Sequence, residues 1–184
     1  GIELSQEEVG LSALKKFNTT LPDKLLQQAN DADGIILGPL DTAAYPPADQ
    51  GGVNVSAVLR KHFDLFANIR PAKSKRGINA LAPAMDLVLV RENTEGFYAD
   101  RTMFSGSGEF MPTSDLALSI RKISRDGSYR IGKAAAAIAA GRPNRKLTIV
   151  TKSNALKVSD GLFLEACTKG AAESPNVELE EIHV

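Results

Sequence analysis

The sequence lacks several features that would assign a protein class directly. It has one cysteine, Cys167, so no disulfide can form within the chain, and a packed thiol is favoured over a nucleophile. Lys and Arg number 22 and Asp and Glu number 22, which argues against a general nucleic-acid or membrane-surface binder. No apolar run approaches the length that crosses a bilayer, and no signal-peptide pattern follows Gly1. We therefore expect a cytoplasmic protein with no nucleic-acid or membrane partner.

Recognisable metal and phosphate sites are also lacking. The two histidines, His62 and His183, have no Cys, His or carboxylate neighbours at the spacing of a metal site. Residues 106–108 (Gly-Ser-Gly) do not lead from a buried strand into a helix, as a dinucleotide fingerprint must. We expect no metal ligands within this chain.

Alternating helical and strand patterns predict an α/β fold, in a chain long enough for one large domain or parts of two. Apolar spacing predicts a helix over 21–31, and the glycine-bracketed run 34–38 predicts a buried parallel strand. Residues 39–52 are expected to form a long loop. Further helices are expected over 53–62, 126–140 and 161–172, strands over 65–70, 85–90, 116–124, 146–151 and 177–184, and a hairpin or loop over 101–112.

Four consecutive alanines, 134–137, fall within the predicted helix over 126–140. They either serve as good helix formers or let two helices approach closely, as at a subunit interface. The sequence leaves both interpretations open.

Three arginines lie at the ends of predicted elements. Arg60 is late in a helix, Arg70 ends a strand before Pro71, and Arg91 ends the next strand. Guanidinium groups match the geometry of carboxylates. Either the three converge on a substrate with two or more carboxylates, or each is a surface ion-pairing residue.

Two further residues are candidates for proton transfer. Tyr98 closely follows the strand that ends at Arg91, and its phenol either donates a proton or packs. Lys152 directly follows the strand over 146–151, beside Ser153 and Asn154, and is either a general base or a solvated side chain.

Three stretches together make the sequence resemble the isocitrate and isopropylmalate dehydrogenase family. They are NVSAVLRKHFDLFANIRP at 54–71, DLVLVRENTEGFY at 86–98 and TIVTKSNALK at 148–157. All three occur in the family's order with compatible spacing, and the resemblance covers essentially the whole chain. It implies a metal-dependent dehydrogenase that oxidises and decarboxylates a 2-hydroxy acid, such as isocitrate or 3-isopropylmalate, with NAD or NADP.

The resemblance also implies how the substrate is bound. Arg60, Arg70 and Arg91 would bind its carboxylates, and Asn54 and Ser56 would lie on the helix that reads its variable end. Isopropylmalate enzymes usually have aliphatic residues where Ser56 lies. Burying an isopropyl group against unpaired hydroxyl and amide groups would cost about 1–3 kcal/mol, so we expect a polar-tailed substrate.

Residue roles in catalysis follow from the same resemblance. Tyr98 would protonate the enol carbon after carbon dioxide leaves. Lys152 would act as the base on the hydroxyl group, donated by the neighbouring subunit of a homodimer. Asn154 would lie near the nicotinamide, and Mg²⁺ or Mn²⁺ would act as a Lewis acid on the substrate.

Relative to the family, the chain departs at both ends. The amino-terminal strand with its Gly-rich turn and the adenine-binding loop are absent, and the aspartates that hold the metal are expected after Val184. We expect residues 1–65 to be part of the cofactor-side domain and 66–184 most of the substrate and dimerisation domain. Such a piece is expected to be inactive alone; the alternative is a non-catalytic dimerisation or regulatory module of the same fold.

Overall fold

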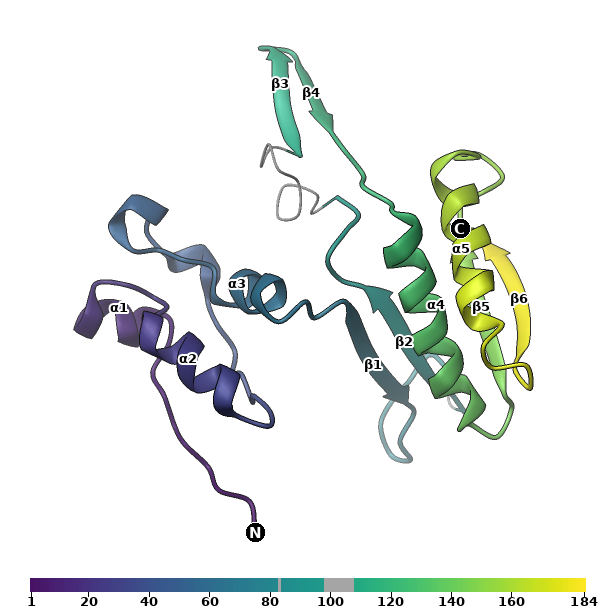
Figure 1. Ribbon diagram of the computed structural model, residues 1–184, viewed down its shortest axis with the longest axis horizontal. Coiled ribbons are helices and arrows are strands. Elements are labelled where there is room, and N and C mark those ends of the chain that lie inside the picture. Colours follow the sequence, from purple (N-terminus) through teal and green to yellow (C-terminus); the bar gives the residue numbers. More distant parts are fainter. Residues whose placement is uncertain (83, 98–107) are drawn as a thin grey trace. The chain divides into compact units, whose positions relative to one another are not determined.

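A computed structural model of the chain describes residues 1–82, 84–97 and 108–184 (Figure 1). Its contacts divide the chain into two compact units, Gly1–Asp64 and Leu65–Val184, each of which is described by itself. The cofactor and substrate roles that the sequence assigns to the two domains stay predictions.

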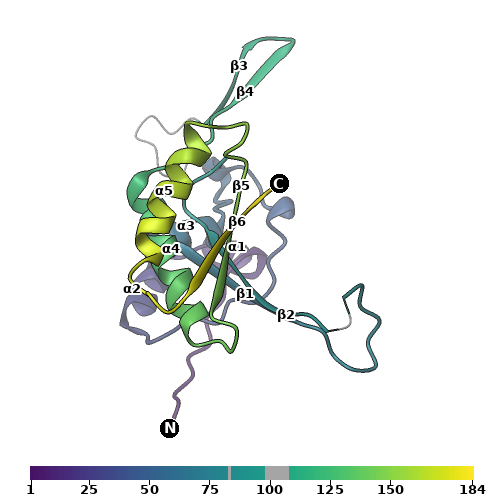
Figure 2. The ribbon, with the colours of Figure 1, turned by 90° about the vertical axis from the view of Figure 1, so that its right-hand side faces the viewer.

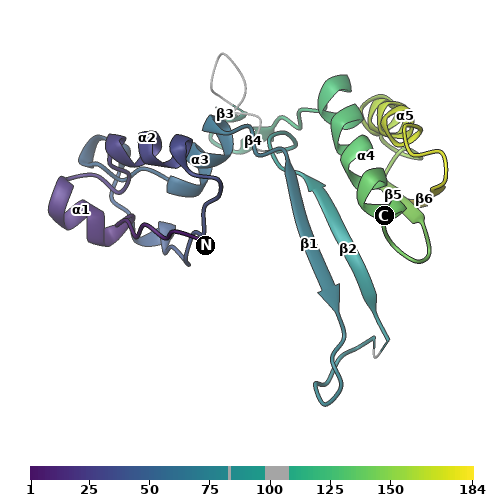
Figure 3. The same ribbon diagram turned by 60° about the horizontal axis from the view of Figure 1, so that its bottom comes forward.

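The first unit is built from helices. They are α1 (Leu11–Phe17), α2 (Asp23–Asp31) and α3 (Val55–His62), with two short 3₁₀ helices, Thr42–Ala44 and Ala48–Gln50, between α2 and α3 (Figure 3). The predicted helices over 21–31 and 53–62 are confirmed as α2 and α3, whereas α1 was not predicted. The core of this first unit contains Leu21, Val55 and Leu59, and Leu25 from α2 packs against it. The apolar spacing of α2 and α3 therefore serves one small core.

The predicted buried strand over 34–38 is wrong, because these residues form neither a strand nor a helix. Ile36 is 95% exposed, and Ile35 and Leu37 are also exposed. A buried parallel strand needs a neighbouring strand to pair with and cover on both faces. Residues 1–64, all of which are described, contain helices and loops but no strand that could pair with this run.

The second unit opens with an antiparallel pair, β1 (Ala67–Lys73) and β2 (Asp86–Glu92). The sequence predicted that the first strand stops at Pro71, but β1 continues through this residue, which pairs with Val88. Among the strands of residues 1–82, 84–97 and 108–184, β2 alone pairs with β1. Proline is tolerated in such an edge strand, where its missing N–H need not enter the hydrogen-bond ladder.

A second antiparallel pair, β3 (Glu109–Thr113) and β4 (Leu116–Ser119), lies where a hairpin or loop and then a strand were predicted. The predicted strand over 116–124 is confirmed only in its first half. The remainder leads to Ser124, whose side chain accepts a hydrogen bond from the N–H of Gly127 and so caps the next helix. Residues 101–107 of the predicted hairpin lie outside the described residues.

A parallel β–α–β unit completes the chain. It consists of β5 (Lys146–Thr151), α5 (Ser159–Ala171) and β6 (Glu178–His183), all close to their predicted bounds. The helix before it, α4 (Arg125–Ala140), lies beside α5 (Figure 2). Three alanines of α4, Ala135, Ala136 and Ala139, are buried and therefore pack within the chain, whereas Ala137 is exposed.

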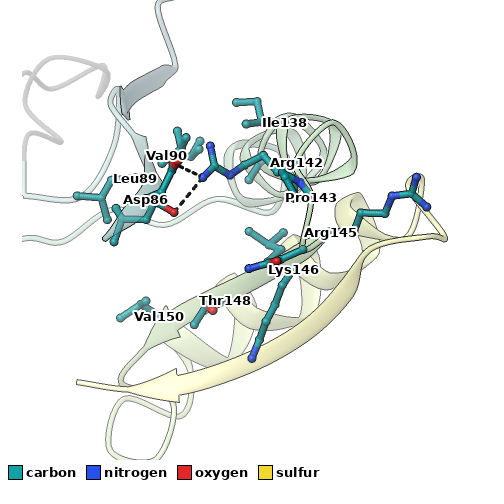
Figure 4. A pocket seen from close by; sticks show the side chains of 16 residues that line it. Asp86, Leu89, Val90, Ile138, Arg142, Pro143, Arg145, Lys146, Thr148 and Val150 are labelled. Atoms are coloured by element: carbon teal, nitrogen blue, oxygen red, sulfur yellow. Dashed lines mark hydrogen bonds and ion pairs between the residues drawn. The ribbon is translucent and has the colours of Figure 1, made fainter. Parts of the chain in front are cut away.

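Between β2 and β5 lies a hollow lined by residues 86–90 of β2 and by most of β5 (Figure 4). Successive side chains of a strand point to opposite faces, so a hollow bordered by consecutive residues lies against the strand's edge. The other edges pair with β1 and β6. At one end Arg142 reaches across from the end of α4 and donates a hydrogen bond to Asp86 at 2.6 Å.

None of the helices in the described part of the chain combines the length and apolar character needed to cross a bilayer.

Candidate functional site

Arg70 and Arg91 project from the same face of the β1–β2 pair. In the antiparallel register Asn68 lies opposite Arg91, and Arg70 lies opposite Leu89. Residues that face each other across the ladder share a face, as do residues two apart on one strand. Two of the three predicted carboxylate-binding arginines are therefore neighbours on one surface.

A chain of hydrogen bonds fixes Arg70 to the base of this surface. Its Nε donates to Oδ1 of Asn68 at 3.0 Å, and Nδ2 of Asn68 donates to Oδ1 of Asn93 at 3.4 Å. Asn93, only 9% exposed, donates in turn to the carbonyl of Leu65 at 3.3 Å. The Arg70 guanidinium is thereby oriented through Nε, and its Nη groups make no hydrogen bond or ion pair with the described residues.

Asn68 and Asn93 were not predicted as site residues. Both lie inside stretches that resemble the dehydrogenase family, Asn68 two residues before Arg70 and Asn93 two residues after Arg91. That placement was the available signal, but an asparagine's partner cannot be read from its spacing.

The two glutamates that follow Arg91 stabilise the local turn. Glu92 accepts hydrogen bonds from the N–H groups of Thr94 and Glu95 at 2.9 and 2.7 Å. Glu95 accepts from the N–H and hydroxyl of Ser124 at 2.9 and 2.5 Å, which ties the turn to the start of α4. With these oxygens engaged inside the protein, the arginines are the groups of this strand end that suit an anionic ligand.

Lys152 follows β5 directly, as predicted, and its side chain is exposed. Its backbone N–H donates to Oδ2 of Asp160 at 2.6 Å, and its Nζ donates to the carbonyl of Val184. Asp160 is 2% exposed and also pairs with Arg121. Asn154, also predicted, is exposed in the turn after Lys152 and makes no hydrogen bond with the described residues.

A second cluster holds the other side of this strand end. Glu181 on β6 accepts hydrogen bonds from the hydroxyls of Ser153 and Thr151, each at 2.6 Å. These two hydrogen bonds, of which the one from Ser153 has the larger effect, lower the pKa of Glu181 below its ordinary value. His183 lies 3.2 Å from the same carboxylate. The chain around Lys152 is thus hydrogen-bonded from two directions.

The other three predicted substrate residues belong to the first unit. Asn54 is the N-cap of α3, and its Oδ1 accepts from the N–H of Ala57 at 3.0 Å, which leaves the donors of its amide nitrogen for a ligand. Ser56 and Arg60, both half-buried, lie four residues apart and share one face of α3. Their convergence with Arg70 and Arg91 stays a prediction.

Tyr98, the predicted proton donor, lies outside the described residues, and its role stays a prediction. Among residues 1–82, 84–97 and 108–184, no group of three or more His, Cys, Asp or Glu side chains is placed to hold a metal ion.

Comparison with known proteins places these features in a family. The model of the isocitrate/isopropylmalate dehydrogenase family matches residues 1–184. The chain is 35% identical over 183 residues to a 3-isopropylmalate dehydrogenase of Methanothermobacter thermautotrophicus, covering 100% of the chain and 51% of that protein. It is 34% identical over 185 residues to an isocitrate/homoisocitrate dehydrogenase of Thermus thermophilus, covering 100% of the chain and 52% of that protein.

Comparison with solved structures leads to the same family. The crystal structure of an isocitrate dehydrogenase from Methylococcus capsulatus matches 96% of this chain and 50% of its own, with a TM-score of 0.78 and 35% identity. The chain thus spans about half the length of the relatives it matches.

Proposed function

Because the chain belongs to the isocitrate/isopropylmalate dehydrogenase family, we propose that it forms part of an enzyme that oxidises and decarboxylates a 2-hydroxy di- or tricarboxylic acid with NAD or NADP. The observation that carries the proposal is the pair Arg70 and Arg91 on one face of β1–β2. Two fixed cations on one surface suit an acid with more than one carboxylate.

In the proposed complex, each of the three arginines binds an oxygen of a substrate carboxylate. Arg70 is held through Nε by Asn68, so its Nη groups face the acid without loss of orientation. Arg91 approaches from the neighbouring strand, and Arg60 supplies a third cation from α3. Each charge-assisted hydrogen bond of this kind contributes about 1.5–3 kcal/mol.

Proton transfer is assigned to an amine and a phenol. The Lys152 amine would take the proton of the substrate hydroxyl, and Asn154 would lie near the nicotinamide, which would supply the hydride acceptor when bound. Carbon dioxide then departs from the carboxylate β to the new ketone, and the remaining electron pair forms an enolate. Tyr98 donates the proton that converts the enolate carbon to product.

The expected cofactors are NAD or NADP and Mg²⁺ or Mn²⁺, the cation acting as a Lewis acid on substrate oxygens. The described residues do not by themselves fit a metal site, because they contain no cluster of three candidate ligands. No step above is therefore assigned to the metal, whose ligands are expected outside residues 1–184.

A polar-tailed acid, such as an isocitrate-type substrate, is the proposed choice. Ser56 presents a hydroxyl, and the amide nitrogen of Asn54, which caps α3 through its oxygen, makes no hydrogen bond with the part of the chain that the structure describes. Leaving these groups unpaired against an isopropyl tail would cost about 1–3 kcal/mol. The matched relatives named above include both isopropylmalate and isocitrate/homoisocitrate enzymes at similar identity, so the family alone does not choose between them.

The active assembly is proposed to be a homodimer, in which Lys152 and Asn154 complete the site of the neighbouring subunit. In that arrangement each subunit contributes to two sites: its arginines to one and its lysine to the other.

The test is turnover by the longest polypeptide that contains residues 1–184, with Mn²⁺ and either NAD or NADP, followed as reduced nicotinamide absorbance. Isocitrate, isopropylmalate, malate and tartrate are compared. In Arg70→Gln the KM for the preferred acid is expected to rise about 10–100-fold, from the lost charge-assisted bond. Arg76→Gln, a change at an exposed arginine of the β1–β2 connection, is the matched control.

Two results would contradict the proposal. One is an absence of turnover with every acid, and binding of an acid without turnover would favour the non-catalytic module. The other is an Arg70→Gln enzyme that behaves like the Arg76→Gln control.

A further inference from the structure

Asp160 is a buried carboxylate that the proposed reaction does not use. It lies in the first turn of α5 and is 2% exposed, although charged side chains are almost never fully buried unless they are paired. Its two oxygens serve different partners. Oδ2 accepts the backbone N–H of Lys152 at 2.6 Å, and Oδ1 accepts from a guanidinium nitrogen of Arg121.

Each partner belongs to a different part of the second unit. Lys152 follows β5, whereas Arg121 lies between β4 and the N-cap of α4. The residue after Arg121, Lys122, exchanges two backbone hydrogen bonds of 2.9 Å with Gly96, at the end of the stretch that begins with Arg91. Asp160 therefore joins the lysine segment to the segment that continues from the predicted carboxylate-binding strand.

We propose that Asp160 is a positioning residue, which fixes the backbone of Lys152 and so sets where its amine meets the substrate hydroxyl. The role rests on the proposed function, in which Lys152 is the base. A long, exposed lysine has many rotamers, so the position of its Cα decides how often its amine reaches the productive geometry. Misplacing a reacting group by about 1 Å can cost about 100-fold in rate.

The chemistry of Asp160→Asn makes the test specific. A carboxylate offers an oxygen to each of the two donors, whereas a carboxamide has one acceptor oxygen and places an N–H₂ group at the other position. The charged guanidinium of Arg121 attracts the oxygen more strongly than a neutral amide does. The N–H of Lys152 is then left facing another donor, in a protein whose shape is otherwise preserved.

Two measurements are made on the same polypeptide. Hydrogen exchange of the Lys152 amide is expected to become about 10-fold faster or more in Asp160→Asn, the equivalent of a lost hydrogen bond. In steady-state kinetics kcat is expected to fall by up to about 100-fold, the cost of misplacing a reacting group, while KM for the acid stays within about 2-fold, because the arginines that bind it are unchanged.

Asp126→Asn is the matched control, since Asp126 occupies the first turn of α4 but is exposed. It should change neither measurement. Arg121→Met is a second variant in case Asp160→Asn folds poorly. It leaves Asp160 with one anchor instead of two, and kcat is expected to fall in the same direction with KM unchanged.

The outcomes separate this role from the proposed function. Unchanged Lys152 amide exchange in Asp160→Asn overturns the positioning role, and so does unchanged kcat in an active enzyme. If the wild-type polypeptide turns over none of the acids, the proposed function fails, and amide exchange alone then decides whether Asp160 holds this segment. A rise in KM equal to the fall in kcat would also count against the role, because it would indicate general disruption of the site.

Discussion

Gly132→Ala is expected to destabilise the second unit, because α4 and α5 approach each other at this residue. A Cβ built on Gly132 would lie 2.2 Å from the carbonyl oxygen of Cys167 and 2.8 Å from its Cα. These are backbone atoms of α5, so no side-chain rotation can relieve the clash. Gly170 makes the reciprocal contact, with its Cβ position 2.1 Å from the carbonyl oxygen of Tyr129 on α4.

The expected magnitude follows from two opposing effects. Overpacking a close contact typically costs 1–3 kcal/mol, and a clash with backbone that forces two helices apart belongs at about 3 kcal/mol. Replacing glycine by alanine inside a helix gains about 1 kcal/mol. The free energy of unfolding should therefore fall by about 2 kcal/mol.

Gly161→Ala is the control for the glycine-to-alanine change itself. Gly161 lies in α5, and a Cβ there meets nothing within 4 Å. Only the helix-propensity term applies, so this variant should gain up to about 1 kcal/mol. The same substitution in two packed helices is thus expected to act with opposite signs.

Urea unfolding followed by far-ultraviolet circular dichroism measures both effects, because the helical signal includes α4 and α5. The transition midpoint should move to lower urea for Gly132→Ala and slightly higher urea for Gly161→Ala, with similar slopes. A Gly132→Ala protein as stable as the wild type would show that the helices are not in close contact. Equal losses in both variants would refute the assignment of the cost to the helix contact.

Two further outcomes concern titration and reactivity. Hydrogen bonds from Lys73 and Arg142 lower the pKa of Asp86 from 3.8 to about 2, so its contribution to stability is complete above the unfolded pKa and lost as pH falls through the folded one. The difference in Tm between wild type and Asp86→Asn should therefore shrink between about pH 4 and pH 2, and a constant difference would contradict the ion pair. Burial raises the pKa of Cys167 to about 11, so a thiol reagent at pH 8 should label it only after unfolding; rapid labelling of the folded protein would refute its burial.

The sequence predicted the elements whose pattern is complete within themselves. Residues 126–140 are rich in alanine, a good helix former, and the structure forms this helix over Arg125–Ala140. The run 34–38 was equally apolar but forms no strand, because a strand depends on neighbours that the run itself does not encode. Pro71 misled the prediction for β1 for the same reason, since only the sheet determines which strand lies at an edge.

For the alanine run, the sequence left two interpretations open: good helix formers, or a close contact between two helices, as at a subunit interface. Small residues do permit a close helix contact, and in the structure Gly132, two residues before the run, lies close to the backbone of α5 in the same chain. The spacing indicated a small-residue surface without identifying what it packs against. Whether the remaining exposed alanine face meets a second subunit stays a prediction.

For the candidate site, sequence reasoning selected the charged residues but missed the polar residues that hold them. Arg70 and Arg91 attract notice because guanidinium groups at strand ends suit carboxylates, and the register places them together. Asn93 and Asp160 carry no such signal, since an asparagine or aspartate is usually exposed. Only the structure reveals that they are buried and which groups they bind.

Most of the buried polar side chains lie next to segments that carry the predicted site residues. Five polar or charged residues are buried in the described part of the chain: Thr20, Asn93, Ser128, Thr151 and Asp160. Each must be hydrogen-bonded to offset its lost hydration, and four of them bind segments that carry or adjoin a predicted residue.

These four buried residues make different contacts, but each of them fixes a segment beside a predicted site residue. Thr20 exchanges hydrogen bonds of 2.6 and 2.8 Å with the backbone of Val53, just before the helix that carries Ser56 and Arg60. Asn93 anchors the Arg70 network, and Thr151 and Asp160 hold the two sides of Lys152. Apolar packing alone would have stabilised these segments at lower desolvation cost but without directional contacts. Hydrogen bonds at fixed angles restrict the backbone beneath the predicted site residues, a property that precise positioning of the proposed reacting groups would require.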